Sequence, residues 1–345
     1  MFTLIAALFV LLRLSQCFDA DYFNPYTQMK PADDTTDSRT ISKKENAQLA
    51  QRCGTTPMYS NQLADYKLET GMWFNDEASH KEYKVLNGAI AMPGQFPWLC
   101  QVFYGKGHIC GSSLISYRHV LTAAHCIVEQ KKIGTRPKKL SVRRMKVLVG
   151  DTRNNRGMAF KVRRAIGHKR YCRFWQSGTC LQGGGDLAVL ELARAVPAQM
   201  VQSGLAEVVC LPRSNEPYPK TRLEAPGWGI TGKETSRQPQ VSDKLLWTTM
   251  WPMGQKVCRQ RRPEISDDII CALELVTNVC MGDSGGPLLT RKVKSRRSVI
   301  LGVVSFGRRC KEMNEAGGYG KGAAFTDVRY YLKWISINIY GGSSR

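Results

Sequence analysis

Four absences narrow what this 345-residue chain can be. No apolar run reaches the roughly 20 residues of a membrane-spanning helix, and no Asn-x-Ser/Thr glycosylation motif occurs. No Cys and His spacing typical of a zinc site is present, and no period of 20–50 residues repeats. The sequence therefore argues against a membrane-spanning helix, a zinc domain and a repeat array.

Acidic residues are also scarce: the chain has 28 Asp and Glu against 50 Lys and Arg, which gives a net charge of +22. The imbalance is uneven along the chain. Residues 18–84 hold 8 basic and 11 acidic residues, whereas residues 85–345 hold 41 basic and 17 acidic ones. An acidic leader therefore precedes a strongly basic domain.

The rest of the composition indicates a globular, exported protein. A hydrophobic content of 43% with 23% charged residues excludes a disordered chain. Twelve cysteines point to an oxidising compartment. Residues 2–12 form an apolar run that is too short to span a bilayer and fits a signal-peptide core, although the usual basic residues before it are missing. We expect residues 1–17 to be a signal peptide and the protein to be secreted.

The pattern of the remaining chain predicts a disordered leader followed by β-structure. Residues 18–50 are polar and lack periodicity, so we expect them to be largely disordered or extended. From Trp98 onward, short strands alternate with turns, as in barrels. Residues 327–340 carry apolar side chains at helical spacing and predict a closing helix. Examples of the expected strands are residues 101–104, 112–115, 147–149 and 187–192.

One hexapeptide, Gly-Asp-Ser-Gly-Gly-Pro at residues 282–287, suits a nucleophile on a tight turn. The backbone N–H groups of Gly282 and Ser284 can converge there on a developing oxyanion. A serine needs a base to become nucleophilic, and His125 in Thr-Ala-Ala-His-Cys is the candidate. Asp186, a lone acid before an apolar run, is the candidate for orienting that histidine.

The order His125, Asp186, Ser284 and the peptides around these residues resemble the chymotrypsin-like (trypsin-fold) serine peptidases. Taken singly, each has an ordinary explanation: a core histidine, a helix cap or a glycine-rich hairpin. The resemblance covers residue 85 to the C-terminus. It implies an all-β fold of two six-stranded antiparallel barrels, at about residues 85–205 and 211–328, with a C-terminal helix and a poorly structured pro-segment before them.

The segment Lys-Val-Leu-Asn-Gly at residues 84–88 resembles the activation site of this family. Cleavage after Lys84 would free an α-ammonium on Val85, which inserts beside Asp283 and orders the oxyanion turn. Because a buried carboxylate without a partner is costly, the uncut chain is expected to hold the site malformed. The alternative is an ordinary exposed lysine before a strand.

The same resemblance implies four disulfides, and two of the remaining cysteines suggest a fifth. Cys53 would pair with Cys210, which keeps residues 18–84 attached as an acidic propeptide or light chain to a peptidase domain at residues 85–345; an unrelated loop bridge is the alternative. Cys100 has no partner left, so it is either buried and free or bridged to another chain. The other pairs that the resemblance implies are Cys110–Cys126, Cys258–Cys271 and Cys280–Cys310. Cys172 and Cys180 are left close together in sequence, and we expect them to be bonded across an inserted loop before Asp186.

The resemblance also places Asn278 at the floor of the substrate pocket, where trypsin has an aspartate. A buried Lys or Arg of the substrate would lose a charge pair of about 2–5 kcal/mol. We therefore expect cleavage after medium apolar residues such as Leu or Met, with residual Lys/Arg cleavage as the alternative, and activation at Lys84 by another, trypsin-like protease. The implied pocket and substrate-binding strand comprise Asn278, Val279, Met281, Ser305, Phe306, Gly307 and Ala323.

Basic runs mark the domain outside the site, and they predict either solvated loops or a polyanion site for a heparin-like glycan. Nothing in the sequence is specific for nucleic acid. Residues 150–156 fall near the family's calcium loop but offer only Asp151 as a carboxylate, so no metal and no cofactor is expected. The runs are Lys131, Lys132, Arg136, Lys138, Lys139, Arg143, Arg144 and Lys146; Lys161, Arg163, Arg164, Lys169 and Arg170; and Arg291, Lys292, Lys294, Arg296 and Arg297.

The sequence thus favours a secreted serine endopeptidase, made as a zymogen, that hydrolyses protein or peptide substrates and meets an activating protease and protease inhibitors. The competing interpretation is a binding or regulatory protein on the same fold, acting through its basic surface with weak or no proteolysis.

Overall fold

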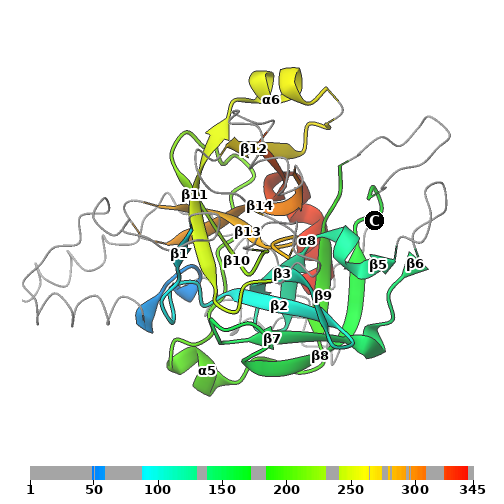
Figure 1. Cartoon of the computed structure of the whole chain (residues 1–345), viewed down its shortest axis with the longest axis vertical. Helices are drawn as coiled ribbons and strands as arrows, with labels where there is room; N and C mark the ends of the chain where they lie inside the picture. The colour runs from blue at the N-terminus through cyan, green and yellow to red at the C-terminus, as the bar shows by residue number, and fades with distance from the viewer. Residues whose placement is uncertain are drawn as a thin grey trace, which may run out of the picture.

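The computed structural model describes most of the chain beyond residue 87 and a short segment before it. The described residues are 49, 51–58, 88–129, 138–171, 184–230, 241–263, 265–273, 279, 282–292, 295, 297–307 and 322–340. Among them, two β-barrels lie one above the other, with the first barrel in cyan to green and the second in yellow to orange (Figure 1).

The first barrel is closed by six antiparallel strands in the order β2-β3-β4-β9-β8-β7. Successive side chains of its strands point alternately into the barrel and out to solvent: in β8, Phe160 and Val162 are buried while Lys161 and Arg163 are exposed. The predicted strands at 101–104, 112–115, 147–149 and 187–192 overlap β2, β3, β7 and β9. The strands are β2 (Leu99–Tyr104), β3 (Gly107–Ser116), β4 (His119–Thr122), β7 (Met145–Val149), β8 (Met158–Gly167) and β9 (Ala188–Leu192).

The second barrel has the order β11-β10-β13-β14-β15-β12 and closes by pairing of β11 with β12. The predicted all-β fold of two six-stranded barrels is therefore confirmed. One boundary differs: β1 (Ala89–Ile90), assigned by sequence to the first barrel, pairs with β11 of the second. The strands are β10 (Leu223–Gly227), β11 (Leu246–Met253), β12 (Ile269–Leu273), β13 (Pro287–Arg291), β14 (Ser298–Phe306) and β15 (Ala323–Asp327).

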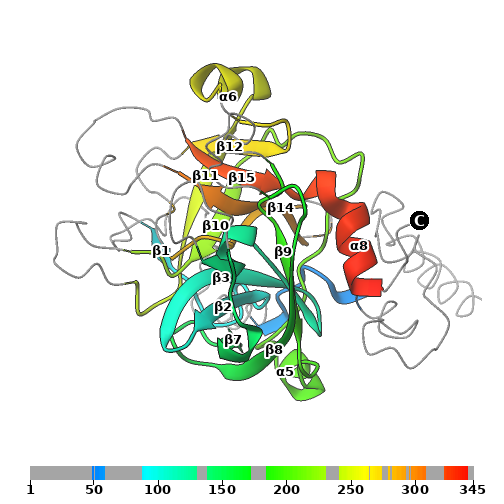
Figure 2. The same ribbon diagram turned by 90° about the vertical axis from the view of Figure 1, so that its right-hand side faces the viewer.

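The predicted closing helix is present as a short 3-10 turn, η3 (Val328–Tyr331), that continues into α8 (Leu332–Tyr340). Asp327 caps the turn, because its carboxylate accepts a hydrogen bond from the backbone N–H of Arg329. Ile335 and Ile339 are fully buried, and α8 packs on the outside of the barrels (Figure 2). The minor elements are η1 (Ala124–Ile127), β5 (Val128–Glu129), β6 (Lys138–Lys139), η2 (Val142–Arg144), α5 (Ala198–Gln202) and α6 (Gln255–Arg261).

The segment around residues 49–58 is fastened to the barrels at several points. Cys53 forms a disulfide with Cys210. Arg52 forms an ion pair of 2.9 Å with the buried Glu207. Leu49 is fully buried. This part of the leader is therefore ordered on the barrels, whereas the rest of the predicted pro-segment lies outside the described residues.

Three disulfides join described cysteines: Cys53–Cys210, Cys110–Cys126 and Cys258–Cys271. The expected partners Cys172, Cys180, Cys280 and Cys310 lie outside the described residues. Cys100 is a free, fully buried thiol whose Sγ lies 3.3 Å from the carbonyl oxygen of Trp98, so the structure favours the buried, free thiol over a bridge to another chain. Within the described part of the chain, none of the helices has the length and apolar character needed to traverse a bilayer.

Candidate active site

His125 and Asp186 meet because the strands that carry them pair. β4 and β9 are antiparallel, with Thr122 opposite Ala188, so the chain leaving β4 and the chain entering β9 lie side by side. His125 follows β4 on η1, and the Cys110–Cys126 disulfide ties η1 to β3. Asp186 stands two residues before β9. The fold therefore brings together two residues that are 61 positions apart.

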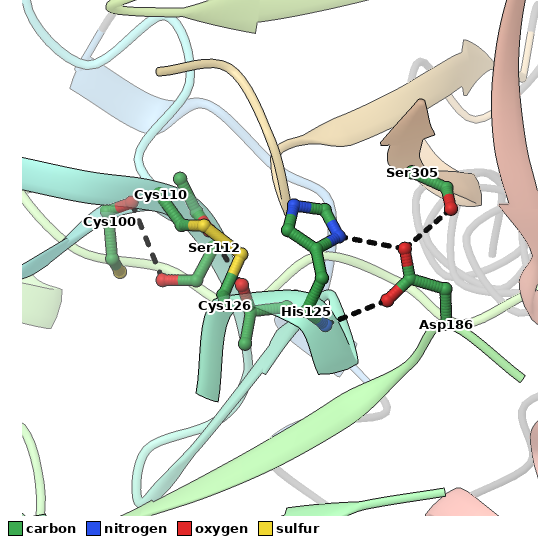
Figure 3. Close-up of a disulfide and its surroundings, with 9 residues drawn as sticks. Cys100, Cys110, Ser112, His125, Cys126, Asp186 and Ser305 are labelled. Carbon is green, nitrogen blue, oxygen red and sulfur yellow. Dashed lines mark hydrogen bonds and ion pairs between the residues drawn. A yellow bond between two sulfur atoms is a disulfide. The ribbon is translucent and has the colours of Figure 1, made fainter. Parts of the chain in front are cut away.

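The Asp186 carboxylate makes two contacts with His125 (Figure 3). Oδ1 accepts a hydrogen bond of 2.9 Å from the backbone N–H, and Oδ2 lies 2.8 Å from the ring Nδ1. Because a carboxylate only accepts, Nδ1 carries the proton and donates it. The other ring nitrogen, Nε2, is then left as an acceptor, which is the form that a general base requires.

Asp186 is further held by the second barrel. The Ser305 hydroxyl donates a 2.5 Å hydrogen bond to Oδ2, and the Thr326 hydroxyl donates one of 3.0 Å to the carbonyl oxygen of Asp186. Burial alone would raise the pKa of Asp186, but the electrostatic attraction of His125 and the hydrogen bonds from His125 and Ser305 outweigh it, so the pKa lies below its usual value. The carboxylate is therefore held in its ionised form.

Ser284 sits on a turn that contacts the strand leading to His125. Gly282 and Gly285 both have positive φ, at 100° and 79°. A Cβ on Gly285 would lie 2.2 Å from the Thr122 hydroxyl oxygen, so only glycine allows this approach to β4. The carbonyl oxygen of Ser284 accepts a 2.8 Å hydrogen bond from the N–H of Gly111 on β3. The turn of the second barrel is thereby docked on the first.

Asp283, beside the nucleophile candidate, is buried against a glycine-rich strand end. Its Oδ1 accepts a 2.7 Å hydrogen bond from the N–H of Gly229. A Cβ on Gly227 or Gly229 would lie 1.9 or 2.1 Å from the carboxylate oxygens, so side chains are excluded on both sides. Lys84 and Val85, the proposed activation residues, lie outside the described residues.

Most of the described pocket candidates lie where the end of β14 meets the start of β15, at the pairing of Phe306 with Ala324. Val279, Ser305 and Ala323 are buried, Phe306 is half-buried and Gly307 is exposed. Asn278 and Met281 lie outside the described residues. Sequence reasoning missed Arg262, whose guanidinium lies 5.4 Å from the Phe306 ring centroid and donates to the carbonyl oxygen of Gly322 at 2.8 Å. No spacing in the sequence links Arg262 to this strand.

One grouping resembles a metal site by proximity alone. The side-chain donor atoms of Cys110, His125 and Cys126 lie within 4.8 Å of one another. The two sulfurs, however, are joined in a disulfide, so neither is available as a thiolate ligand.

Comparison with known proteins gives the family. A family model described as Trypsin matches residues 85–335. The clotting factor G β subunit of Tachypleus tridentatus is 29% identical over 276 residues, covering 75% of this chain and 81% of that protein. Urokinase-type plasminogen activator of Gallus gallus is 30% identical over 275 residues, covering 75% and 58%. Coagulation factor XII of Cavia porcellus is 30% identical over 266 residues, covering 73% and 40%, so the match spans less than two thirds of the last two relatives. The chain belongs to the trypsin family of serine endopeptidases.

Proposed function

We propose that the chain is a secreted serine endopeptidase that hydrolyses peptide bonds with Ser284, His125 and Asp186. The observation that carries this proposal is the double contact of Asp186 with His125, at 2.9 and 2.8 Å, beside the glycine turn of Ser284. Ser284 attacks the scissile carbonyl, and Nε2 of His125 accepts its proton and later returns it to the leaving amine. Asp186 fixes the tautomer and stabilises the imidazolium.

The oxyanion is stabilised by the backbone N–H groups of Gly282 and Ser284. The positive φ of Gly282 supports this role, because it turns the peptide plane in a way that other residues rarely adopt. An extended substrate pairs with the Ser305–Gly307 segment through backbone hydrogen bonds. Gly307 is exposed, which suits a strand edge that receives a peptide.

The zymogen is activated by cleavage after Lys84. The new α-ammonium of Val85 forms an ion pair with Asp283 and orders the oxyanion turn. The burial of Asp283, which is 6% exposed, supports this step, because a carboxylate removed from water gains most from a cationic partner.

The pocket is neutral and selects medium apolar residues such as Leu or Met. The burial of Val279 and Ala323 supports an apolar wall, and the neutral Asn278 offers no charge to a Lys or Arg side chain. The activating protease is consequently a different, trypsin-like enzyme that accepts Lys84. Other partners are protein or peptide substrates and protease inhibitors.

The test uses purified chain cut after Lys84 by an added protease, with Ser284→Ala as the control. We expect a fluorophosphonate to label the cut wild type and not the variant, and a peptide library to be cleaved after one class of residue. A cut chain with Val85 as its N-terminus that neither labels nor cleaves would overturn the proposal in favour of a binding protein. Strong preference for Lys over Leu would overturn the pocket assignment.

A second proposed activity is the binding of a heparin-like polyanion through the β7–β8 hairpin. Lys146 and Lys161 are paired directly opposite each other on these strands. Like charges in such a pair are destabilising, and within the described residues neither lysine has an acidic partner, so an external polyanion would relieve the repulsion. Elution from heparin at lower salt for Lys146→Gln/Lys161→Gln than for wild type is expected; unchanged elution would contradict the proposal.

A further inference from the structure

Asp268 is a buried acid that no part of the proposed mechanism uses. It precedes β12 in the second barrel and is 2% exposed. Three donors converge on its carboxylate: the hydroxyls of Ser266 and Tyr331, and the backbone N–H of Gly185 at 2.9 Å. Gly185 belongs to the first barrel and is the residue immediately before Asp186. The carboxylate of Asp268 thus crosses from one barrel to the loop that presents the triad acid.

The contact with this loop is close. Gly185 has a φ of 85°, and a Cβ on Gly184 would lie 2.1 Å from both carboxylate oxygens of Asp268. Two glycines therefore allow the loop to lie directly on the acid. The N–H of Leu187 donates a 2.7 Å hydrogen bond to the carbonyl oxygen of Gly185, which tightens the turn around Asp186.

Strand β15 of the same barrel contacts Asp186, the residue that follows Gly185. Ile269 on β12 pairs with Thr326 on β15, and the N–H of Asp327 donates a 2.8 Å hydrogen bond to the carbonyl oxygen of Asp268. Thr326 in turn donates its hydroxyl to the carbonyl oxygen of Asp186 at 3.0 Å. The backbone N–H of Gly185 is therefore bound by Asp268, and the carbonyl oxygen of Asp186 is bound by Thr326. These two partners lie on paired strands of the second barrel or next to them.

We propose that Asp268 is a positioning residue for catalysis: with Thr326 it forms a clamp from the second barrel that sets the place of the Asp186 carboxylate on His125. The inference rests on the proposed function of the triad. Asp268 acts through the backbone of the loop and not on the substrate, so its loss should slow the chemical step and leave substrate binding unchanged. A displacement on the order of 1 Å in such a constellation can cost about 100-fold in rate.

The experiment compares Asp268→Ala with a matched control, Glu207→Ala. Glu207 is also a fully buried carboxylate that accepts from a backbone N–H, that of Val208 at 3.1 Å, and from a tyrosine hydroxyl, that of Tyr117 at 3.2 Å. It holds the residue 49–58 segment and not the triad loop. Each variant is cut after Lys84, and kcat, KM, the rate of fluorophosphonate labelling and the melting temperature are measured.

We expect Asp268→Ala to lower kcat and the labelling rate together by about 10- to 100-fold, with KM within about twofold of wild type. Asp268→Asn should recover most of the rate, because its oxygen can accept from Gly185 and Tyr331 while its amide donates to the Ser266 hydroxyl. Glu207→Ala should lower the melting temperature and leave kcat within about twofold.

A normal kcat for Asp268→Ala, or an equal loss in Glu207→Ala, would overturn the inference. Where Asp268→Ala does not fold, Gly184→Ala serves instead, because its Cβ would lie 2.1 Å from the Asp268 carboxylate and push the loop off the acid. The clamp predicts a lower kcat with KM unchanged for this variant, and a normal kcat refutes it. Failure of the wild type to label would refute the proposed function itself, whereas a labelling wild type with an equally fast Asp268→Ala would refute only the clamp.

Discussion

Replacing Asp186 with asparagine is the sharpest test of the His125 contact, because it changes one oxygen to an amide nitrogen at nearly constant shape. The carboxylate serves three donors: the His125 backbone N–H at Oδ1, and the His125 Nδ1–H and the Ser305 hydroxyl at Oδ2. An asparagine has one acceptor oxygen and one amino group that only donates. One of the two positions must therefore receive the wrong group.

The geometry decides which position that is. An amino group at the Oδ1 position would face a backbone N–H that cannot change, and an unsatisfied buried donor costs about 1–3 kcal/mol. At the Oδ2 position the clash disappears when the His125 proton moves from Nδ1 to Nε2 and the Ser305 hydroxyl rotates to accept. The second arrangement leaves no group unsatisfied and so prevails. Nε2 is then protonated and cannot accept the proton of Ser284.

We therefore expect Asp186→Asn to lower kcat about 10⁴-fold at neutral pH, or about 5 kcal/mol in barrier, with little change in melting temperature. Ser305→Ala is the matched variant, since it removes one hydrogen bond to the same oxygen without changing the tautomer and should cost at most about 100-fold. The assay is turnover of a cleaved library peptide by chain cut after Lys84. A loss below about tenfold in a folded Asp186→Asn would refute the assignment of Asp186 to the triad.

Three further outcomes are expected. Burial raises the pKa of Glu207, so the contribution of Glu207 to stability is present at low pH and declines as pH rises through its pKa in the folded protein. Because Arg52 stabilises the ionised carboxylate, Arg52→Met should cost about 1 kcal/mol of unfolding free energy at mildly alkaline pH and less at mildly acidic pH. Thermal melts measure the cost, and an equal cost at both pH values would contradict this prediction. Gly285→Ala places a Cβ 2.2 Å from a side-chain oxygen of β4 and should slow fluorophosphonate labelling about tenfold or more, whereas Gly254→Ala, where no atom lies within 4 Å of the new Cβ, should label normally. Cys100, whose pKa burial raises, should resist alkylation in the native protein and react only after unfolding, and modification without unfolding would show that the thiol is accessible.

Much of the candidate site could be predicted from the sequence, because its requirements are local. A nucleophile turn needs residues without a Cβ, so Gly282 and Gly285 appear beside Ser284 and carry the positive φ values observed. The helix at the C-terminus was predictable for the same reason, since the helical spacing of its apolar side chains is visible within one short segment of the sequence. The two-barrel fold was predicted from the family resemblance, because the alternating pattern of a short strand does not show which other strand it pairs with.

Only the tertiary structure decided the features that depend on pairing between distant segments. The pairing of β1 with β11, rather than with a strand of the first barrel, is one example, because a two-residue strand is too short for its sequence to indicate its pairing partner. The fate of Cys100 is another, since its burial and not its count makes it a free thiol. Asp268 is the clearest case: it is 82 residues from Asp186 along the chain, and no spacing connects them. The sequence by itself determined which groups are candidates for the chemistry, because that chemistry demands particular residue types. The positions of these groups relative to one another were decided by the docking of two barrels, which creates contacts that no local pattern contains.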